Sequence, residues 1–340
     1  MLKLEPFRAG VDDWGRAVSA FPEHHVFHTP AWLAYVAETQ GGTPVLATLT
    51  DGREPVGYFA GLIIRRFGAR ILGSPFPGWG TEYMGFQLCE GVSRKEAAKA
   101  LIAYAFDELH CLHLEFRDRS FEAADVEGLG FDVRTTLGYE IDLTPPESEI
   151  LGRMDHGCRW SIRKAARMGI TIEEAHDEGF ADDYYAQLQD VFAKQRLVPP
   201  YGRDRVRTLI RLLLPTGMLL LLRARDSEGR CVATGIFPGA NSRMLFWGGA
   251  SWRQFQSLRP NELLMWHALQ YWKLRGARCC DMGGGGDYKR KYGPFEIRVP
   301  HFVKSRLPLV AQARDAARRL FGLKQQVFGR MRAWTRSPQP

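Results

Sequence analysis

The segment RCCDMGGGGDYKRKYGP, residues 278–294, ends an apolar run in four consecutive glycines and continues with alternating basic and aromatic residues. A Walker phosphate loop requires the pattern G-x-x-x-x-G-K-[ST], which this segment lacks. A Rossmann fingerprint requires G-x-G-x-x-G, and the sixth position counted from Gly283 is Tyr288. Both nucleotide-binding motifs are therefore excluded. The pattern predicts a strand that ends in glycines, which either let the backbone approach a ligand or form only a mobile connection.

The same order of elements is predicted in each half of the chain: three strands, a helix and a further strand. In the first half these are strands at 43–50, 55–67 and 69–75, a helix at 93–109 with Ser93 as N-cap, and a strand at 112–117. In the second half they are strands at 217–226, 231–239 and 242–251, a helix at 261–276 with Asn261 as N-cap, and a strand at 277–284.

Each half also begins with predicted helical segments. The first follows Thr29 as N-cap with Pro30 at the first helical position, and the second covers residues 147–169. Two prolines in the segment 143–149 prevent continuous helix or sheet there. We therefore expect two similar α/β domains, residues 1–145 and 146–308, followed by a basic amphipathic helical tail at 309–340.

Composition is typical of a globular protein, with 45% hydrophobic and 25% charged residues in 340. The net charge is +8, and residues 311–336 hold seven basic residues against one acidic residue, so the tail supplies +6 of it. Apolar runs of signal-peptide or membrane-spanning length are absent, which predicts a cytoplasmic protein. The six cysteines form no C-x-x-C pair, so we expect reduced thiols and no metal site.

The glycine-rich segment resembles the one that closes the second domain of Fem-type (FemAB-like) proteins, where D-x-G-G is followed by F-K-x-x-F-G. The matching pairs are Tyr288–Lys289 and Tyr292–Gly293. Residues 246–281 resemble the same family's strand, P-N-x-L-L helix and final strand, and residues 159–169 resemble its basic helix. The glycine run is more similar to the cellulose-biosynthesis (CelD/BcsL-type) acetyltransferases than to the cell-wall ligases.

This resemblance, over about residues 20–305, implies an α/β (α+β) fold of tandem GNAT-like domains, each a mixed sheet flanked by helices. It also implies an acyltransferase that moves an acyl or aminoacyl group to an amine. Such a reaction needs a neutral amine, stabilisation of an oxyanion and a proton for the leaving group.

The resemblance places Lys289 where negative charge develops; the alternative is an exposed lysine on a loop. If Lys289 has this role, Lys289→Met should abolish transfer. If its side chain is also exposed, the substitution should change the free energy of unfolding by no more than about 1 kcal/mol. Asp281 and Asp287 flank the glycines and are candidates to orient the amine or accept its proton. For Asp281 the alternative is a carboxylate that only caps backbone amides.

Candidate substrate-binding residues occur in three further places. In the loop 73–86, Trp79, Glu82 and Tyr83 combine aromatic rings with a carboxylate, which suits an amine or a sugar, or else the loop is a hydrophobic plug between the domains. Arg159 and Arg163 begin a stripe on one helix face, either an anion site or a solvated surface. The remaining candidates are Arg196, Trp247, Arg259 and Tyr288, with a simple core position as the alternative for Trp247.

The co-substrate is expected to be acyl-CoA or aminoacyl-tRNA, with no tightly bound cofactor. The GNAT phosphate loop [QR]-x-x-G-x-[GA] is absent from both equivalent places, CEGVSRKEAA at 89–98 and QSLRPNELL at 256–264, which disfavours ordinary CoA binding. An amine-bearing cell-envelope or exopolysaccharide precursor is the expected acceptor, and tRNA is a second candidate partner. The alternative function is a non-catalytic scaffold of an envelope or polysaccharide assembly complex, with the tail binding a polyanion or lying peripherally on the inner membrane face.

Overall fold

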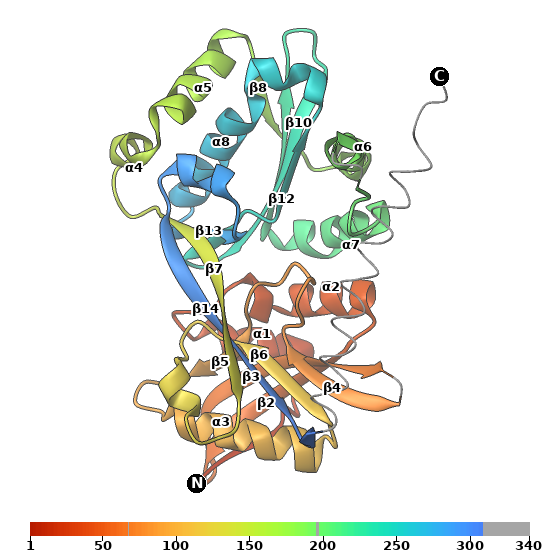
Figure 1. Ribbon diagram of the computed structural model, residues 1–340, viewed down its shortest axis with the longest axis vertical. Coiled ribbons are helices and arrows are strands. Elements are labelled where there is room, and N and C mark those ends of the chain that lie inside the picture. Colours follow the sequence, from red (N-terminus) through yellow and green to blue (C-terminus); the bar gives the residue numbers. More distant parts are fainter. Residues whose placement is uncertain (67, 195–196, 309–340) are drawn as a thin grey trace.

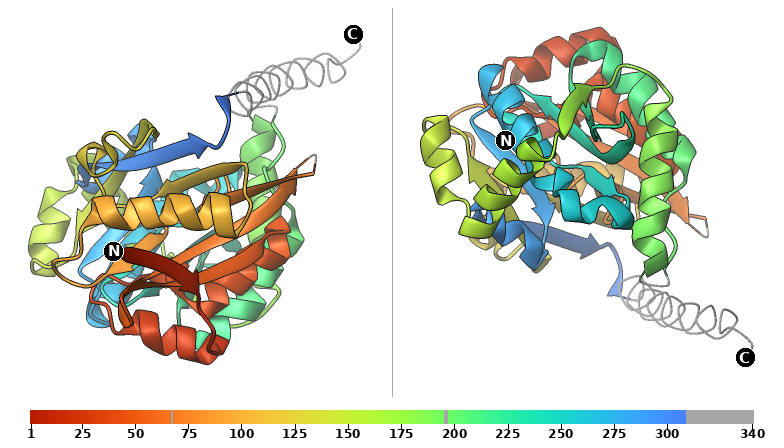
Figure 2. Two further views of the ribbon diagram at one scale, coloured as in Figure 1. Left: turned by 90° about the horizontal axis from the view of Figure 1, so that it is seen from below. Right: turned by 90° about the horizontal axis from the view of Figure 1, so that it is seen from above.

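In the computed structural model, the described residues, 1–66, 68–194 and 197–308, build one mixed sheet of 14 strands with helices packed against it (Figures 1 and 2). The strands of the first half are β1 (Leu2–Pro6), β2 (Thr43–Asp51), β3 (Glu54–Arg66), β4 (Ala69–Ser74), β5 (Gly85–Leu88), β6 (His113–Arg117) and β7 (Asp132–Asp142). Those of the second half are β8 (Thr171–Glu174), β9 (Leu219–Arg225), β10 (Cys231–Ala240), β11 (Arg243–Leu245), β12 (Gly248–Ser251), β13 (Cys279–Gly284) and β14 (Phe295–Ser305).

Helices α1 to α3 belong to the first half of the chain and α4 to α8 to the second. They are α1 (Val11–Ser19), α2 (Pro30–Gln40), α3 (Arg94–Ala103), α4 (Glu147–Arg153), α5 (His156–Arg167), α6 (Phe180–Lys194), α7 (Arg203–Leu213) and α8 (Pro260–Leu274). Figure 2 shows α3 lying across the strands of the first half, and α5 packs against α8 in the second. The prediction of an α/β fold with a mixed sheet and flanking helices is confirmed.

Both halves contain a strand that is broken in the same manner. In the first half β4 and β5 both pair with β3, but only β4 continues the sheet by pairing in parallel with β6. In the second half β11 and β12 both pair with β10, and β11 alone pairs in parallel with β13. The prediction of one strand over 242–251 is therefore wrong. In both halves the second strand of the pair, β5 or β12, therefore does not pair with the parallel strand, β6 or β13.

Two long strands that the sequence analysis did not predict join the halves (Figure 1). Strand β7 pairs with β14 along most of its length and with β13 at its carboxyl end. Strand β14 then pairs with β6, so residues late in the chain complete the sheet of the first half. Its Phe302 is fully buried and stacks on Phe116 of β6, with ring centroids 4.7 Å apart. The boundaries 1–145 and 146–308 stay predictions, but the two parts share one continuous sheet.

Helix starts follow the local signals in most places. Thr29 and Ser93 act as N-caps through their side chains, as predicted. Asn261 is not the N-cap of α8: the helix begins at Pro260, Arg259 occupies the cap with a φ of 61°, and the Asn261 amide donates to Ser251 Oγ at 3.0 Å. The single helix predicted at 147–169 is two helices, because Asp155 caps the start of α5 by accepting from the amide of Cys158.

The predicted tail at 309–340 lies outside the described residues. Among the helices that the structure describes, none combines the length and the apolar character needed to cross a membrane.

The pairing of β14 with β6 predicts that Phe302 stabilises the first half although it lies far along the chain. We expect Phe302→Ala to lower the free energy of unfolding by about 3–5 kcal/mol, the usual loss for a buried phenylalanine. Phe295 on the same strand is 49% exposed and serves as the control, with Phe295→Ala changing stability by less than about 1 kcal/mol. Urea unfolding measures both, and equal small losses would contradict the arrangement.

Candidate active site

Lys289 holds the glycine run in a folded-back loop. It lies in the short helix Asp287–Tyr292 and only 7% of it is exposed. Its Nζ donates to the carbonyl oxygens of Met282 at 2.5 Å and of Gly284 at 2.6 Å. The alternative of an exposed loop lysine is wrong, so the expectation that replacing Lys289 leaves stability almost unchanged loses the exposure on which it rested. Burial lowers the pKa of Lys289, while Glu82 and Asp281 oppose this shift.

Asp281 is the most buried acid of this region, with 2% exposure. One of its oxygens, Oδ1, accepts from the amide of Gly283 at 2.7 Å, as a capping carboxylate does. The other, Oδ2, is buried without a hydrogen-bond partner and lies 3.9 Å from Nη1 of Arg119. Burial raises the pKa of Asp281, Glu140 opposite it in the sheet raises it further, and Arg119 acts against both. Asp281 therefore caps the backbone amide of Gly283 with Oδ1 only, and Oδ2 can still accept a hydrogen bond.

Glu82 lies with Lys289 and Asp281 and completes a group of three titratable side chains. A small cavity of about 10 Å³, close to the room needed by one water molecule, is lined by Glu82, Asp281, Gly283 and Arg117 among others. Burial and then Asp281 raise the pKa of Glu82, whereas Arg117 and Lys289 lower it. The structure thus brings together Lys289, Asp281 and Glu82, which the sequence analysis had named separately.

A buried ion cluster adjoins this group and was missed by sequence reasoning. Arg119, which follows β6, and Arg243, the first residue of β11, both donate from Nη1 to the same oxygen of Glu140 on β7. Burial alone would raise the pKa of Glu140, which is 4% exposed, but the hydrogen bonds and charges of the two arginines lower it. Arg119 also lies over the ring of Tyr83, 5.0 Å from its centroid. No local pattern joins these positions, since each comes from a different segment.

Two predicted residues beside Lys289, Asp287 and Tyr288, are largely exposed. The side chain of Asp287 is 99% exposed and its carboxylate lies 3.7 Å from the guanidinium of Arg290. Tyr288 is 58% exposed, with its ring centroid 5.8 Å from Nζ of Lys289. The structure therefore does not bring Asp287 to the carboxylates.

The loop 73–86 divides its side chains between two environments. Tyr83 is buried, together with Phe76, Met84 and Phe86, in agreement with a hydrophobic plug between the halves. The ring of Trp79 packs at a tilt against Phe76, and the Trp79 carbonyl oxygen accepts a hydrogen bond from Arg205. Arg205 also lies 6.0 Å from the ring of Trp247, so Trp79 and Trp247 border one aromatic contact between the halves. Only Glu82 of this loop lines the small cavity with Asp281.

The predicted arginines lie elsewhere in the second half. Arg159 on α5 donates to the carbonyl oxygens of Gly152 and Met154 and so binds the end of α4. Arg163 is exposed on the same helix. Arg259 lies 5.9 Å from the ring of Trp160. Arg196 falls outside the described residues. Within the described part of the chain, no three His, Cys, Asp or Glu side chains are grouped so that they could hold a metal ion.

The raised pKa values of Glu82 and Asp281 predict a pH-dependent stability. A carboxyl whose pKa is higher in the folded state stabilises the fold below its unfolded pKa of about 4, and this contribution is lost as the pH rises through the folded pKa. The double variant Glu82→Gln/Asp281→Asn cannot lose it, so its free energy of unfolding relative to the wild type should increase with pH. Urea unfolding from acid to neutral pH measures this difference. Asp287→Asn, at a side chain of the same loop that is 99% exposed, is the control. A constant difference for the double variant would contradict the shifts.

Comparison with known proteins places this geometry in context. Residues 153–292 match the family model of an acetyltransferase (GNAT) domain. No curated protein matches the chain. The crystal structure of FemX superposes with a TM-score of 0.76 at 13% identity, covering 91% of this chain and 99% of FemX.

Two further solved structures cover the chain at lower similarity. The C-terminal domain of a putative lysylphosphatidylglycerol synthetase from Agrobacterium fabrum has a TM-score of 0.55 at 11% identity, covering 91% of this chain and 97% of that domain. A tandem GNAT protein from the clavulanic acid biosynthesis pathway has a TM-score of 0.53 at 14% identity, covering 91% and 99%. At such identities the likeness concerns the fold. The family model adds that residues 153–292, within the second half, are similar to an acetyltransferase (GNAT) domain.

Proposed function

We propose that the protein transfers an acyl or aminoacyl group to an amine of a cell-envelope or exopolysaccharide precursor, and that Lys289, Asp281 and Glu82 carry the reaction. The observation that supports this most is Oδ2 of Asp281, which is buried near a buried lysine and accepts no hydrogen bond, with the guanidinium of Arg119 3.9 Å away. An unpaired polar atom in such a place costs free energy, and it persists where a substrate supplies the missing partner.

The three side chains fit the steps of acyl transfer. The amine nitrogen attacks the carbonyl carbon of the donor, the bond from that carbon to sulfur or oxygen breaks, and the leaving atom takes up the proton that the amine gives to a carboxylate. The proton lost by the amine passes to Asp281 or Glu82, whose raised pKa values make them stronger bases than ordinary carboxylates. An ammonium group has three N–H donors, and Lys289 uses two of them on Met282 and Gly284. The third is left for the negative charge that develops on the carbonyl oxygen.

Both donor classes stay in the proposal. The name of the tandem GNAT structure specifies a form without acetyl-CoA, so acetyl-CoA is the ligand considered for that protein. This supports a thioester donor. The name of the other relative refers to lysylphosphatidylglycerol, which supports an aminoacyl donor and an envelope acceptor. A GNAT phosphate loop would lie at the start of α8. There Arg259 is the N-cap residue, with a φ of 61° and no hydrogen bond from its side chain to the helix, so this helix start does not by itself favour the CoA donor. A scaffold function remains the alternative, and it depends on the tail at 309–340.

Replacement of Lys289 tests the reaction. We expect Lys289→Met to lower the transfer rate by about 100-fold or more, as loss of an oxyanion donor does, and stability by about 1.5–3 kcal/mol. The rate is measured at a temperature where circular dichroism shows the variant to be folded. Lys291→Met is the control, since Lys291 pairs with Glu262 instead. Undiminished transfer by folded Lys289→Met would remove this residue from the mechanism.

Equilibrium binding identifies the donor. We expect saturable binding of either acetyl-CoA and longer acyl-CoAs or an aminoacyl-tRNA mixture to the full chain, measured at two salt concentrations. Binding of tRNA should weaken strongly with salt because counterions are released. Binding of CoA alone assigns the thioester donor, and salt-sensitive binding of tRNA alone assigns the aminoacyl donor. If neither binds, the scaffold function is favoured over catalysis.

A further inference from the structure

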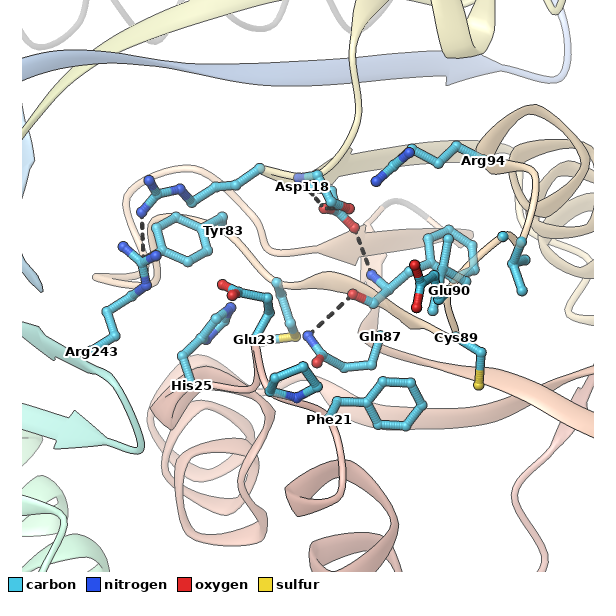
Figure 3. A pocket seen from close by; sticks show the side chains of 18 residues that line it. Phe21, Glu23, His25, Tyr83, Gln87, Cys89, Glu90, Arg94, Asp118 and Arg243 are labelled. Atoms are coloured by element: carbon cyan, nitrogen blue, oxygen red, sulfur yellow. Dashed lines mark hydrogen bonds between the residues drawn. The ribbon is translucent and has the colours of Figure 1, made fainter. Parts of the chain in front are cut away.

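A second and much larger cavity lies where β5 leaves the sheet of the first half (Figure 3). Its volume is about 680 Å³, within the range of small-molecule sites. The walls come from residues 21–25, from residues 83–94 around β5, from the loop 118–120 and from Arg243 of the second half. The side chains of Phe21, Met84 and Phe86 make part of the wall apolar.

Positive charge is concentrated at the end of the cavity where the two halves meet. Arg119 and Arg243 both line it, and Figure 3 shows Arg243 beside Tyr83 there. The two guanidinium groups share one oxygen of Glu140, and both bonds use Nη1. Each guanidinium carries five N–H donors, and the side chains keep 23% and 17% exposure, so further donors are open to the cavity. Two cations therefore border the cavity, with Glu140 bound to both and Asp281 3.9 Å from Arg119.

His25 adds a polar atom that lacks a partner. It is 6% exposed, lines the same cavity and has no hydrogen bond at Nδ1. Burial, then the neighbouring His28, Arg243 and Arg119, hold its pKa well below the ordinary value. The ring is therefore neutral at physiological pH and offers one donor and one acceptor nitrogen. A ligand group bonded to Nδ1 would remove the cost of leaving this atom unpaired.

The acidic side chains of the cavity do not neutralise this end. Asp118 is engaged by the amide of Phe86 through one oxygen and by Ser120 through the other. Glu23 and Glu90 are exposed to solvent, and Figure 3 draws Glu23 near His25. In Figure 3, Glu90 lies with Arg94 and Cys89 on the side away from Arg243. The open positive charge thus belongs to Arg119 and Arg243.

We propose that this cavity binds the amine acceptor through an anionic group, a carboxylate or a phosphate, held by Arg119 and Arg243 with His25 as a neutral hydrogen-bond partner. The assignment of the ligand as acceptor rests on the proposed function. Arg119 also lies 3.9 Å from Oδ2 of Asp281, so it borders both the cavity and the candidate catalytic carboxylate. An anionic group bound there would lie against the same guanidinium that approaches Asp281.

Binding of simple anions tests the site without any turnover. Inorganic phosphate, pyrophosphate and glutarate are titrated calorimetrically into the full chain at low salt. We expect at least one to bind saturably, and Arg119→Gln or Arg243→Gln to weaken that binding about tenfold or more, the loss expected for a hydrogen bond between charged groups. Tighter binding of phosphate or pyrophosphate would indicate a phosphate ligand, and tighter binding of glutarate a carboxylate ligand. Arg94→Gln, at the other end of the cavity, is the matched control and should change affinity less than about twofold.

A variant of Glu140 separates binding from a structural effect. Glu140→Gln removes the competing carboxylate but keeps both arginines, so anion affinity should be retained or increased. Loss of binding by a folded Glu140→Gln protein would overturn the proposal. So would the absence of binding of all three anions to the wild type, or an Arg94→Gln variant that is as impaired as Arg243→Gln.

Transfer kinetics keep this inference distinct from the proposed function. If both hold, Arg243→Gln raises KM for the acceptor and leaves donor binding unchanged. If transfer occurs but KM for the acceptor is unaffected, the acceptor site is wrong and the transferase stands. If the protein binds anions through Arg119 and Arg243 but transfers no acyl group, the proposed function fails while the anion site remains.

Discussion

The buried carboxylate of Glu140 is the point on which the arrangement of the two halves depends. It lies on β7, at the place where that strand pairs with both β13 and β14. Arg119 comes from the first half and Arg243 from the second, and both donate to the same oxygen. A buried ion pair that loses one partner typically costs about 3–5 kcal/mol, so a displacement of either half would be strongly resisted. This constraint also fixes Asp281, which lies opposite Glu140 in the sheet.

The same cluster separates two chemically different spaces. On one side, Asp281 and Glu82 share a cavity that admits little more than a water molecule, and their pKa values are raised. On the other side, Arg119 and Arg243 border a cavity of about 680 Å³. Arg119 contacts both environments, so it couples the electrostatics of the candidate reaction group to whatever occupies the larger cavity. A bound anion would offset the charge that the arginine now directs toward Asp281.

Local sequence signals predicted those parts of the fold that depend on neighbouring residues. Thr29 and Ser93 cap helices as expected, and the strand that ends at Gly284 delivers Asp281 to the site. Strands β7 and β14 were not predicted, because their pairing depends on partners far along the chain. Arg119, Glu140 and Arg243 were missed for the same reason, since only the folded sheet brings them together.

Lys289 shows how far a local pattern can mislead. A lysine after four glycines resembles an exposed loop residue, yet the backbone freedom of those glycines lets the loop turn its carbonyl oxygens toward the ammonium group. Gly283 has a φ of +71°, a conformation that other residues rarely adopt. The sequence singled out Lys289 as a candidate but did not predict that its ammonium group binds the carbonyl oxygens of Met282 and Gly284 in the loop.

The path of β14 has a consequence for how the protein is made. Residues 295–305 supply the strand that lies beside β6 in the first half, and they leave the ribosome after nearly all of the described chain. Until then the edge of β6 lacks its neighbour and Phe116 lacks the ring that covers it. An unpaired strand edge readily associates with other chains. The nascent first half must therefore be protected during synthesis, and a chain interrupted before residue 295 would be prone to aggregate instead of forming a stable fragment.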